Sequence, residues 1–144
     1  MSEQNRELAK RWFEEVWNQR KIETVHELLT DRSACRSETG ELKGAQAFLT
    51  QGYEPFIAAF PDLTIDVEGT VAEGDEVVVR WKATGTHHGP MGPLPPTGRR
   101  IEFRGMTWAR IQDGKLFEGR DCWNMGALFQ ALQTGQSTGS VEVL

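Results

Sequence analysis

The chain has 144 residues, 38% of them hydrophobic, which is enough for one domain to bury a core of its own. Its basic residues are scattered and its net charge is −5, so neither nucleic acid nor an anionic membrane is expected as a partner. The two cysteines, Cys35 and Cys122, form no disulfide framework or zinc motif, and no apolar leader or membrane-spanning run is present. The sequence therefore predicts a cytoplasmic protein.

The first half of the chain predicts helices. Over residues 4–18 apolar side chains recur every three or four positions between charged ones, as is typical of an amphipathic helix. A shorter repeat over residues 22–29 predicts a second helix, and a short strand and a turn are expected over residues 30–40. A longer helix is expected from about Ala45 to the proline at position 61, with Pro55 as a candidate kink.

The second half predicts strands, because the hydrophobic period changes to two. Residues 63–86 and 100–124 each predict a hairpin, the second around the tight turn Asp113–Gly114. Between them, Gly89–Gly98 contains four of the six prolines and predicts a long loop.

A short helix around residues 128–132 ends the predicted fold. Residues 1–134 are expected to form a single domain, and residues 135–144, which are small and polar, a mobile tail. Helices followed by antiparallel strands predict an α+β fold. We expect a curved antiparallel sheet wrapped around the N-terminal helices, forming a cone, or α+β barrel, with an internal pocket.

Five ordered segments have a familiar pattern. They are Arg11–Asn18 (RWFEEVWN), Ala59–Leu63 (AFPDL), Val79–His87 (VRWKATGTH), Pro95–Arg100 (PPTGRR) and Asp113–Lys115 (DGK). In order and spacing they resemble the SnoaL-like polyketide cyclase family, in the nuclear transport factor two-like superfamily of α+β cones, over roughly residues 5–133.

The resemblance implies a homodimer whose pocket closes a polyketide ring by an aldol reaction, with no metal or cofactor. It also implies that an aspartate on the last strand is the general acid and base, which Asp121 matches. The chain departs from the common pattern at Ala34–Arg36, where a histidine is frequent, and at Arg120, where a tryptophan is frequent. Because members also differ in reaction, the substrate is not carried over.

Asp121 is the first catalytic candidate. A carboxylate transfers protons near neutral pH only if an apolar enclosure raises its pKa, and Cys122, Trp123 and the aromatic helices could provide one. The alternative is a strand carboxylate that pairs with an arginine outside any pocket.

Two further catalytic candidates lie on and just beyond one predicted strand. Arg80 and Lys82 alternate with apolar residues and so share a face, where they either hold a substrate oxygen in the pocket or lie on the solvated outer side. His87 and His88 end the strand, one pointing in and one out, and His87 is a candidate acid, base or oxyanion donor. No metal is expected, since no further ligand stands at a suitable spacing.

The remaining candidates would bind substrate. These residues are Trp12, Tyr53, Lys82, Met91, Trp108 and Trp123. Aromatic side chains at such spacing are usually core, whereas Met91 and Leu94, on the predicted loop, fit a lid over the pocket or a dimer contact.

Three functions stay open at this point. The first is a cofactor-independent lyase, cyclase or isomerase that moves a proton on a hydrophobic carbonyl compound. The second is a hydrolase resembling limonene epoxide hydrolases, for which Arg80 and Asp121 fit two of three catalytic places and Lys82 occupies the third, which needs an aspartate. The third is a non-catalytic module that binds a small apolar molecule or a protein.

Overall fold

The computed structural model describes residues 2–134 and 140–141. It begins with helix α1 (Ser2–Arg11), which continues without a break into the π-helical segment η1 (Trp12–Asn18), and the short helix α2 (Ile22–Leu28) follows. The apolar stripe of α1 and η1 is buried, and α1 packs on strands β3 (Thr64–Glu73) and β4 (Glu76–Thr86). The amphipathic helix predicted at the N-terminus is thereby confirmed. Within the described chain, no helix is long and apolar enough to cross a bilayer.

The predicted third helix is three consecutive segments. They are α3 (Gly44–Ala47), the π-helical η2 (Phe48–Tyr53) and α4 (Glu54–Ala59). Pro55 lies in the first turn of α4, directly after η2. Proline removes one backbone N–H from the continuous helix, and the wider π-helical turn that precedes it accommodates the ring.

The remaining elements are mostly strands. They are β1 (Leu29–Ser37), β2 (Gly40–Lys43), β5 (Arg100–Gln112), β6 (Lys115–Cys122) and β7 (Ser140–Val141), with helix α5 (Met125–Thr134) after β6. Both predicted hairpins, β3–β4 and β5–β6, are present. The tail predicted to be mobile, residues 135–144, lies outside the described residues except for β7.

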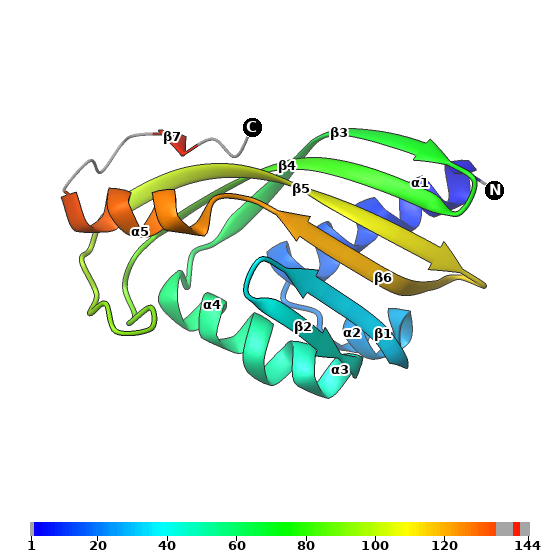
Figure 1. The fold of residues 1–144 in the computed structure, drawn as a ribbon, viewed down its shortest axis with the longest axis horizontal. Coiled ribbons are helices and arrows are strands. Elements are labelled where there is room, and N and C mark those ends of the chain that lie inside the picture. The colour runs from blue at the N-terminus through cyan, green and yellow to red at the C-terminus, as the bar shows by residue number, and fades with distance from the viewer. Residues whose placement is uncertain (1, 135–139, 142–144) are drawn as a thin grey trace.

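The strands form one curved sheet in the order β2-β1-β6-β5-β4-β3, and β7 pairs with β5. Figure 1 shows this sheet curving over the helices. The expected α+β fold is confirmed, with two refinements. The sheet is not purely antiparallel, because β1 runs parallel to β6 and β7 parallel to β5. It also does not close into a barrel, because β2 and β3 are its two edges.

The alternation of side chains along β4 and β5 decides which residues reach the interior. Val77, Val79 and Trp81 of β4 are buried, as are Ile101 and Phe103 of β5, while the residues between them point to the opposite face. The inner face therefore holds the core, and only every second residue of a strand can belong to an internal site.

Candidate functional site

A cavity of about 570 Å³ lies between the concave face of the sheet and the helices. This volume is in the range of sites that bind organic ligands of drug size. Its wall is mostly apolar and includes many aromatic side chains. The aromatic lining residues are Trp12, Phe13, Trp17, Phe48, Phe56, Trp81, Phe103 and Trp123.

The aromatic rings that line the cavity come from helices and sheet and pack against one another. Trp12 of η1 lies 5.2 Å from Phe48 of η2, measured between ring centroids. Trp123, which follows β6, lies 5.1 Å from Phe103 and 6.0 Å from Phe56. Trp12 and Trp123 thus lie where a substrate-binding role requires, and that role stays a prediction.

Asp121 projects from β6 into this cavity. Its side chain has substantial accessible surface, because it lines the cavity, while protein atoms crowd around the carboxyl group. Burial raises the pKa of the carboxyl group, and a hydrogen bond from Thr107 opposes that rise. The Oγ1 atom of Thr107 donates to Oδ1 of Asp121 over 2.6 Å. The surroundings of Asp121 therefore shift its pKa upward from the usual value, and its catalytic role stays a prediction.

The structure adds two cavity residues that the sequence had not singled out. Thr107 of β5 lies opposite Asp121 in the strand register. Cys35 of β1 also lines the cavity, and burial, together with the charge of Asp121, raises the pKa of its thiol to about 12. Cys35 is thus a neutral thiol at physiological pH. Strand alternation along β5 could have found Thr107, because it lies four residues after the inward-facing Phe103. No local signal could have found Cys35, because its place depends on the pairing of β1 with β6, two segments far apart in the sequence.

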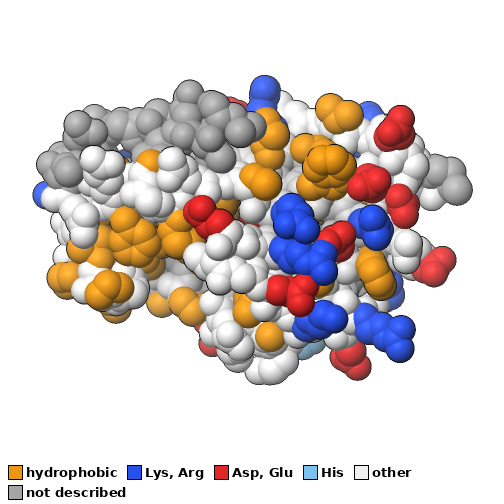
Figure 2. All heavy atoms as spheres, viewed as in Figure 1, with side chains coloured by type: hydrophobic (Ala, Val, Ile, Leu, Met, Phe, Trp, Pro, Cys, Tyr) orange, Lys and Arg blue, Asp and Glu red, His pale blue; other side chains and the backbone are white. Residues whose placement is uncertain are grey.

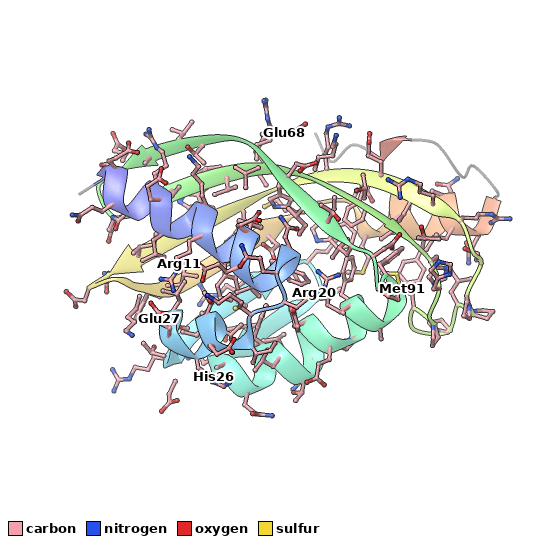
Figure 3. The ribbon with its side chains drawn as sticks, turned by 180° about the vertical axis from the view of Figure 1, so that it is seen from behind. Arg11, Arg20, His26, Glu27, Glu68 and Met91 are labelled. Carbon is pink, nitrogen blue, oxygen red and sulfur yellow. The ribbon has the colours of Figure 1, made fainter. Side chains whose placement is uncertain are left out.

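The predicted loop contributes to the rim of the cavity. Pro90, Met91 and Gly92 line it, and Met91 and Leu94 exchange backbone hydrogen bonds of 2.9 and 3.0 Å. Figure 3 shows Met91 next to the C-terminal end of α4. Gly89 permits this close approach, because a Cβ atom there would lie 2.1 Å from the carbonyl oxygen of Ala58. Met91 thus lies on the rim of the cavity, and its role as a lid or a dimer contact stays a prediction.

His87 is fully buried but does not line the cavity. Its Nδ1 atom accepts a hydrogen bond from the backbone N–H of Thr97 over 3.2 Å and lies 3.0 Å from the Thr97 hydroxyl. Burial lowers the pKa of the imidazole, so the neutral form is favoured. The prediction that His87 acts on substrate is wrong for this geometry. Instead, the ring fastens the start of the loop to its end.

Arg80 and Lys82 lie on the outer face of the sheet. Their neighbours Val79 and Trp81 take the inner positions, so strand alternation turns both cations away from the cavity. The Nζ atom of Lys82 lies 4.0 Å from a carboxylate oxygen of Glu102 on the same face. The predicted pocket roles of Arg80 and Lys82 are therefore wrong, and the solvated alternative applies.

Two predicted aromatic contacts also lie elsewhere. Trp108 is on the outer face, 52% exposed, and its indole N–H donates to Glu76 over 2.7 Å. Tyr53 is buried, but its hydroxyl donates to the backbone carbonyl of Val16 over 2.8 Å and the residue does not line the cavity. Cys122, expected to help enclose Asp121, is exposed on the other side of β6.

A curved α+β sheet whose cavity is lined by one strand aspartate is typical of the nuclear transport factor two-like class. The family model of the SnoaL-like polyketide cyclases matches residues 7–132, so the chain belongs to that family. A search of curated proteins finds no match.

Solved structures support the same assignment. A SnoaL-like polyketide cyclase, provisionally assigned, from Jannaschia sp. CCS1 is 26% identical with a TM-score of 0.86, covering 92% of this chain and 94% of its own. AclR from Streptomyces galilaeus, provisionally a hydroxylase, is 27% identical with a TM-score of 0.80, covering 92% and 97%. IdmH from Streptomyces antibioticus, provisionally a polyketide cyclase, is 25% identical with a TM-score of 0.76, covering 90% and 97%.

Proposed function

We propose that this chain is a cofactor-independent acid–base catalyst, a lyase or isomerase, that acts on a hydrophobic carbonyl compound. The observation that carries the proposal is the position of Asp121. A carboxylate in a mostly apolar cavity has few groups to stabilise its charge, and no cation pairs with Asp121 among the described residues. Such a group is retained more readily for chemistry than for stability. The family and the cyclase assignments of its similar structures support this proposal.

Asp121 alone can carry out both proton transfers of the reaction, first as the base and then as the acid. The carboxylate takes a proton from a carbon next to a carbonyl group, and the C–H electron pair moves into the enolate. In an aldol ring closure, the enolate carbon bonds to a second carbonyl carbon, and that oxygen receives the proton from Asp121. In an isomerisation, the proton returns to a different carbon. Either route regenerates the carboxylate and oxidises nothing.

The two alternatives fit the geometry less well. An epoxide hydrolase of this fold would need an arginine beside Asp121, and Arg80 lies on the outer face. A binding module needs the cavity but not a carboxylate with a raised pKa inside it. The homodimer implied by the family stays a prediction, which the mass of the protein in solution tests.

Deuterium exchange tests the proposal without knowledge of the natural substrate. The probe is 2-tetralone, a bicyclic ketone with acidic C–H bonds, together with two larger fused-ring ketones, incubated in D2O and followed by mass spectrometry. We expect the protein to accelerate exchange over buffer and Asp121→Asn to reduce that acceleration by roughly 10²- to 10⁴-fold. Asp66→Asn is the matched control, because Asp66 is exposed on β3, away from the cavity.

Two results contradict the proposal. If Asp121→Asn exchanges deuterium as fast as the unaltered protein, Asp121 is not the base. If none of the three ketones exchanges faster than in buffer although they bind in the cavity, the binding module becomes the better account.

A further inference from the structure

Three side chains on adjacent strands form a hydrogen-bonded chain that ends at Asp121. Trp81 of β4 donates from Nε1 to Oγ1 of Thr107 over 3.0 Å, and Thr107 donates to Oδ1 of Asp121 over 2.6 Å. The strand register accounts for the alignment. On one side of β5, Thr107 pairs with Asp121 of β6. On the other side, Thr107 pairs with Val79 of β4, and Trp81 lies two residues further along that strand on the same face. All three side chains line the cavity.

The direction of these hydrogen bonds follows from the groups involved. An indole N–H only donates, so the Thr107 oxygen must be the acceptor from Trp81. The single hydroxyl proton of Thr107 is then free to point at Asp121, whose ionised carboxylate only accepts. Trp81 thus fixes the rotation of the Thr107 hydroxyl, and the proton of that hydroxyl is committed to Oδ1.

The second carboxylate oxygen is left for the cavity. Among the residues that the structure describes, the bond from Thr107 is the only hydrogen bond to the Asp121 carboxylate. The side chain nevertheless has accessible surface, and this surface faces the cavity. Oδ1 is therefore occupied, while Oδ2 is open to a ligand.

We propose that Thr107, oriented by Trp81, is the positioning residue of this site, holding Asp121 by Oδ1 so that Oδ2 alone exchanges protons with the substrate. The inference rests on the proposed acid–base role of Asp121 and deepens it. It assigns a role to two residues of the inner face that are neither charged nor expected to react.

The far end of the chain is rigid. Trp81 is buried, and its ring lies over Gly105 of β5, where a Cβ atom would come within 2.6 Å of the indole. Phe103 packs on the same ring edge to face, with centroids 6.0 Å apart. The ring cannot turn without displacing these neighbours, so its N–H stays aimed at Thr107.

The Thr107 hydrogen bond also acts against burial. A hydrogen bond to the ionised form stabilises it, whereas burial favours the neutral acid. Among the described lining residues, the other titratable groups are Cys35, Arg36 and Glu41. Arg36 and Glu41 pair with each other over 2.7 Å, and Cys35 is a neutral thiol near neutral pH. The hydrogen bond from Thr107 is therefore the specific local contact that lowers the pKa of Asp121.

A carboxyl titration tests this role without any turnover. The protein is labelled with aspartate carrying ¹³C in the side-chain carboxyl group, the chemical shifts are followed by NMR against pH, and Asp121→Asn identifies the relevant signal among six aspartates. We expect Thr107→Val to raise the titration midpoint of Asp121 by about one to two pH units, because a hydrogen bond to the charged form is lost. Thr107→Ser should restore the midpoint, and Trp81→Phe should raise it by less than Thr107→Val.

Valine matches threonine in shape, and near-ultraviolet circular dichroism checks that each variant is folded. An unchanged midpoint in folded Thr107→Val, or a serine variant that behaves like the valine variant, overturns the positioning role. Failure of the proposed function looks different, because the ketones would then not exchange while the midpoints still moved as expected. If exchange occurs, the acid limb of its pH–rate profile should move with the midpoint in Thr107→Val.

Discussion

The two faces of β4 and β5 carry the same kinds of residue and use them in opposite ways. On the outer face, Arg80 and Trp108 are exposed, and Lys82 lies near Glu102. On the inner face, Trp81 is buried and its indole N–H donates a hydrogen bond to Thr107, which in turn donates one to the single cavity aspartate, Asp121. A polar atom on the outer face has water as an alternative partner, whereas one on the inner face depends on the side chains around it.

Charged side chains also differ between the outer surface and the cavity. Figure 2 shows Lys and Arg interspersed with Asp and Glu on the face that carries β6 and β1, where Arg36 pairs with Glu41 and Glu118. In the cavity, Asp121 has the neutral hydroxyl of Thr107 and the neutral thiol of Cys35 as neighbours, and the other lining carboxylate, Glu41, pairs with Arg36. Surface pairs of this kind add little stability, whereas the surroundings of Asp121 raise the pKa of its carboxyl group. The inner face is therefore where single substitutions should have large effects.

The largest difference between the faces should appear for two aromatic residues of β5. Phe103→Ala removes a ring that is 2% exposed and contacts Trp81, Trp123 and Phe56, so we expect the free energy of unfolding to fall by about 3–5 kcal/mol. Trp108→Ala, on the same strand but 52% exposed, should lower it by about 1 kcal/mol or less. Urea unfolding of both variants makes the comparison. Equal losses would show that the outer ring is buried in solution, as in a dimer.

A smaller effect is expected from adding one methyl group on the inner face. In Gly105→Ala the new Cβ atom would lie 2.6 Å from the Trp81 ring and 2.9 Å from Cβ of Trp123, so we expect a loss of about 1–3 kcal/mol. Gly119→Ala is the matched control, because nothing lies within 4 Å of its added Cβ atom. Thermal unfolding measures both. If Gly105→Ala is as stable as the control, the Trp81 ring has freedom to move and is not the fixed end of the hydrogen-bonded chain.

The Asp121 carboxyl group should make stability depend on pH. The pKa of Asp121 is raised in the folded protein above its unfolded value of about 3.9. Below that value the group is neutral in both states and has no effect. As the pH rises through the unfolded pKa toward the folded one, the unfolded chain loses its proton first, and stability falls.

Asp121→Asn removes this dependence. We expect its melting temperature to be slightly above that of the unaltered protein at pH 7, since water that reaches the exposed side chain reduces the effect, and to match it near pH 3. Asp66→Asn, whose side chain is exposed, supplies the control at both values. A variant that is less stable than the parent at pH 7 would mean that the folded protein favours the Asp121 carboxylate over the acid.

Much of this architecture could be predicted from the sequence, because its signals are local. The apolar stripe of α1 and η1, the turn at Asp113–Gly114 and the proline-rich loop depend only on neighbouring residues. Asp121 could be placed in the site by its match to the family's aspartate on the last strand, and strand parity puts Trp123 on the same face. The parallel pairing of β1 with β6 could not be predicted, since it joins segments more than eighty residues apart and carries no turn signal.

The errors share one physical cause. Alternation shows that Arg80 and Lys82 share a face but not which face is inner, and buried Val79 and Trp81 decide that question. Trp108 has the aromatic character of a substrate contact, but Thr107, one residue earlier, has the inward position. For His87, the strand end leaves the direction of the side chain open, and the partner, Thr97, comes from the far end of the loop.

The smallest effects should come from the outer cations, and their absence would be informative. Arg80→Gln and Lys82→Gln keep most of each side chain and remove the charge, so we expect the free energy of unfolding to change by about 0.5 kcal/mol or less. Exchange of 2-tetralone should be unchanged in both, because neither residue lines the cavity that contains Asp121. If either variant instead lost exchange as Asp121→Asn is expected to, while staying folded, the outer face would have to contact the substrate. The assignment of the chemistry to the inner face would then be wrong, since strand alternation prevents one side chain of β4 from serving both faces.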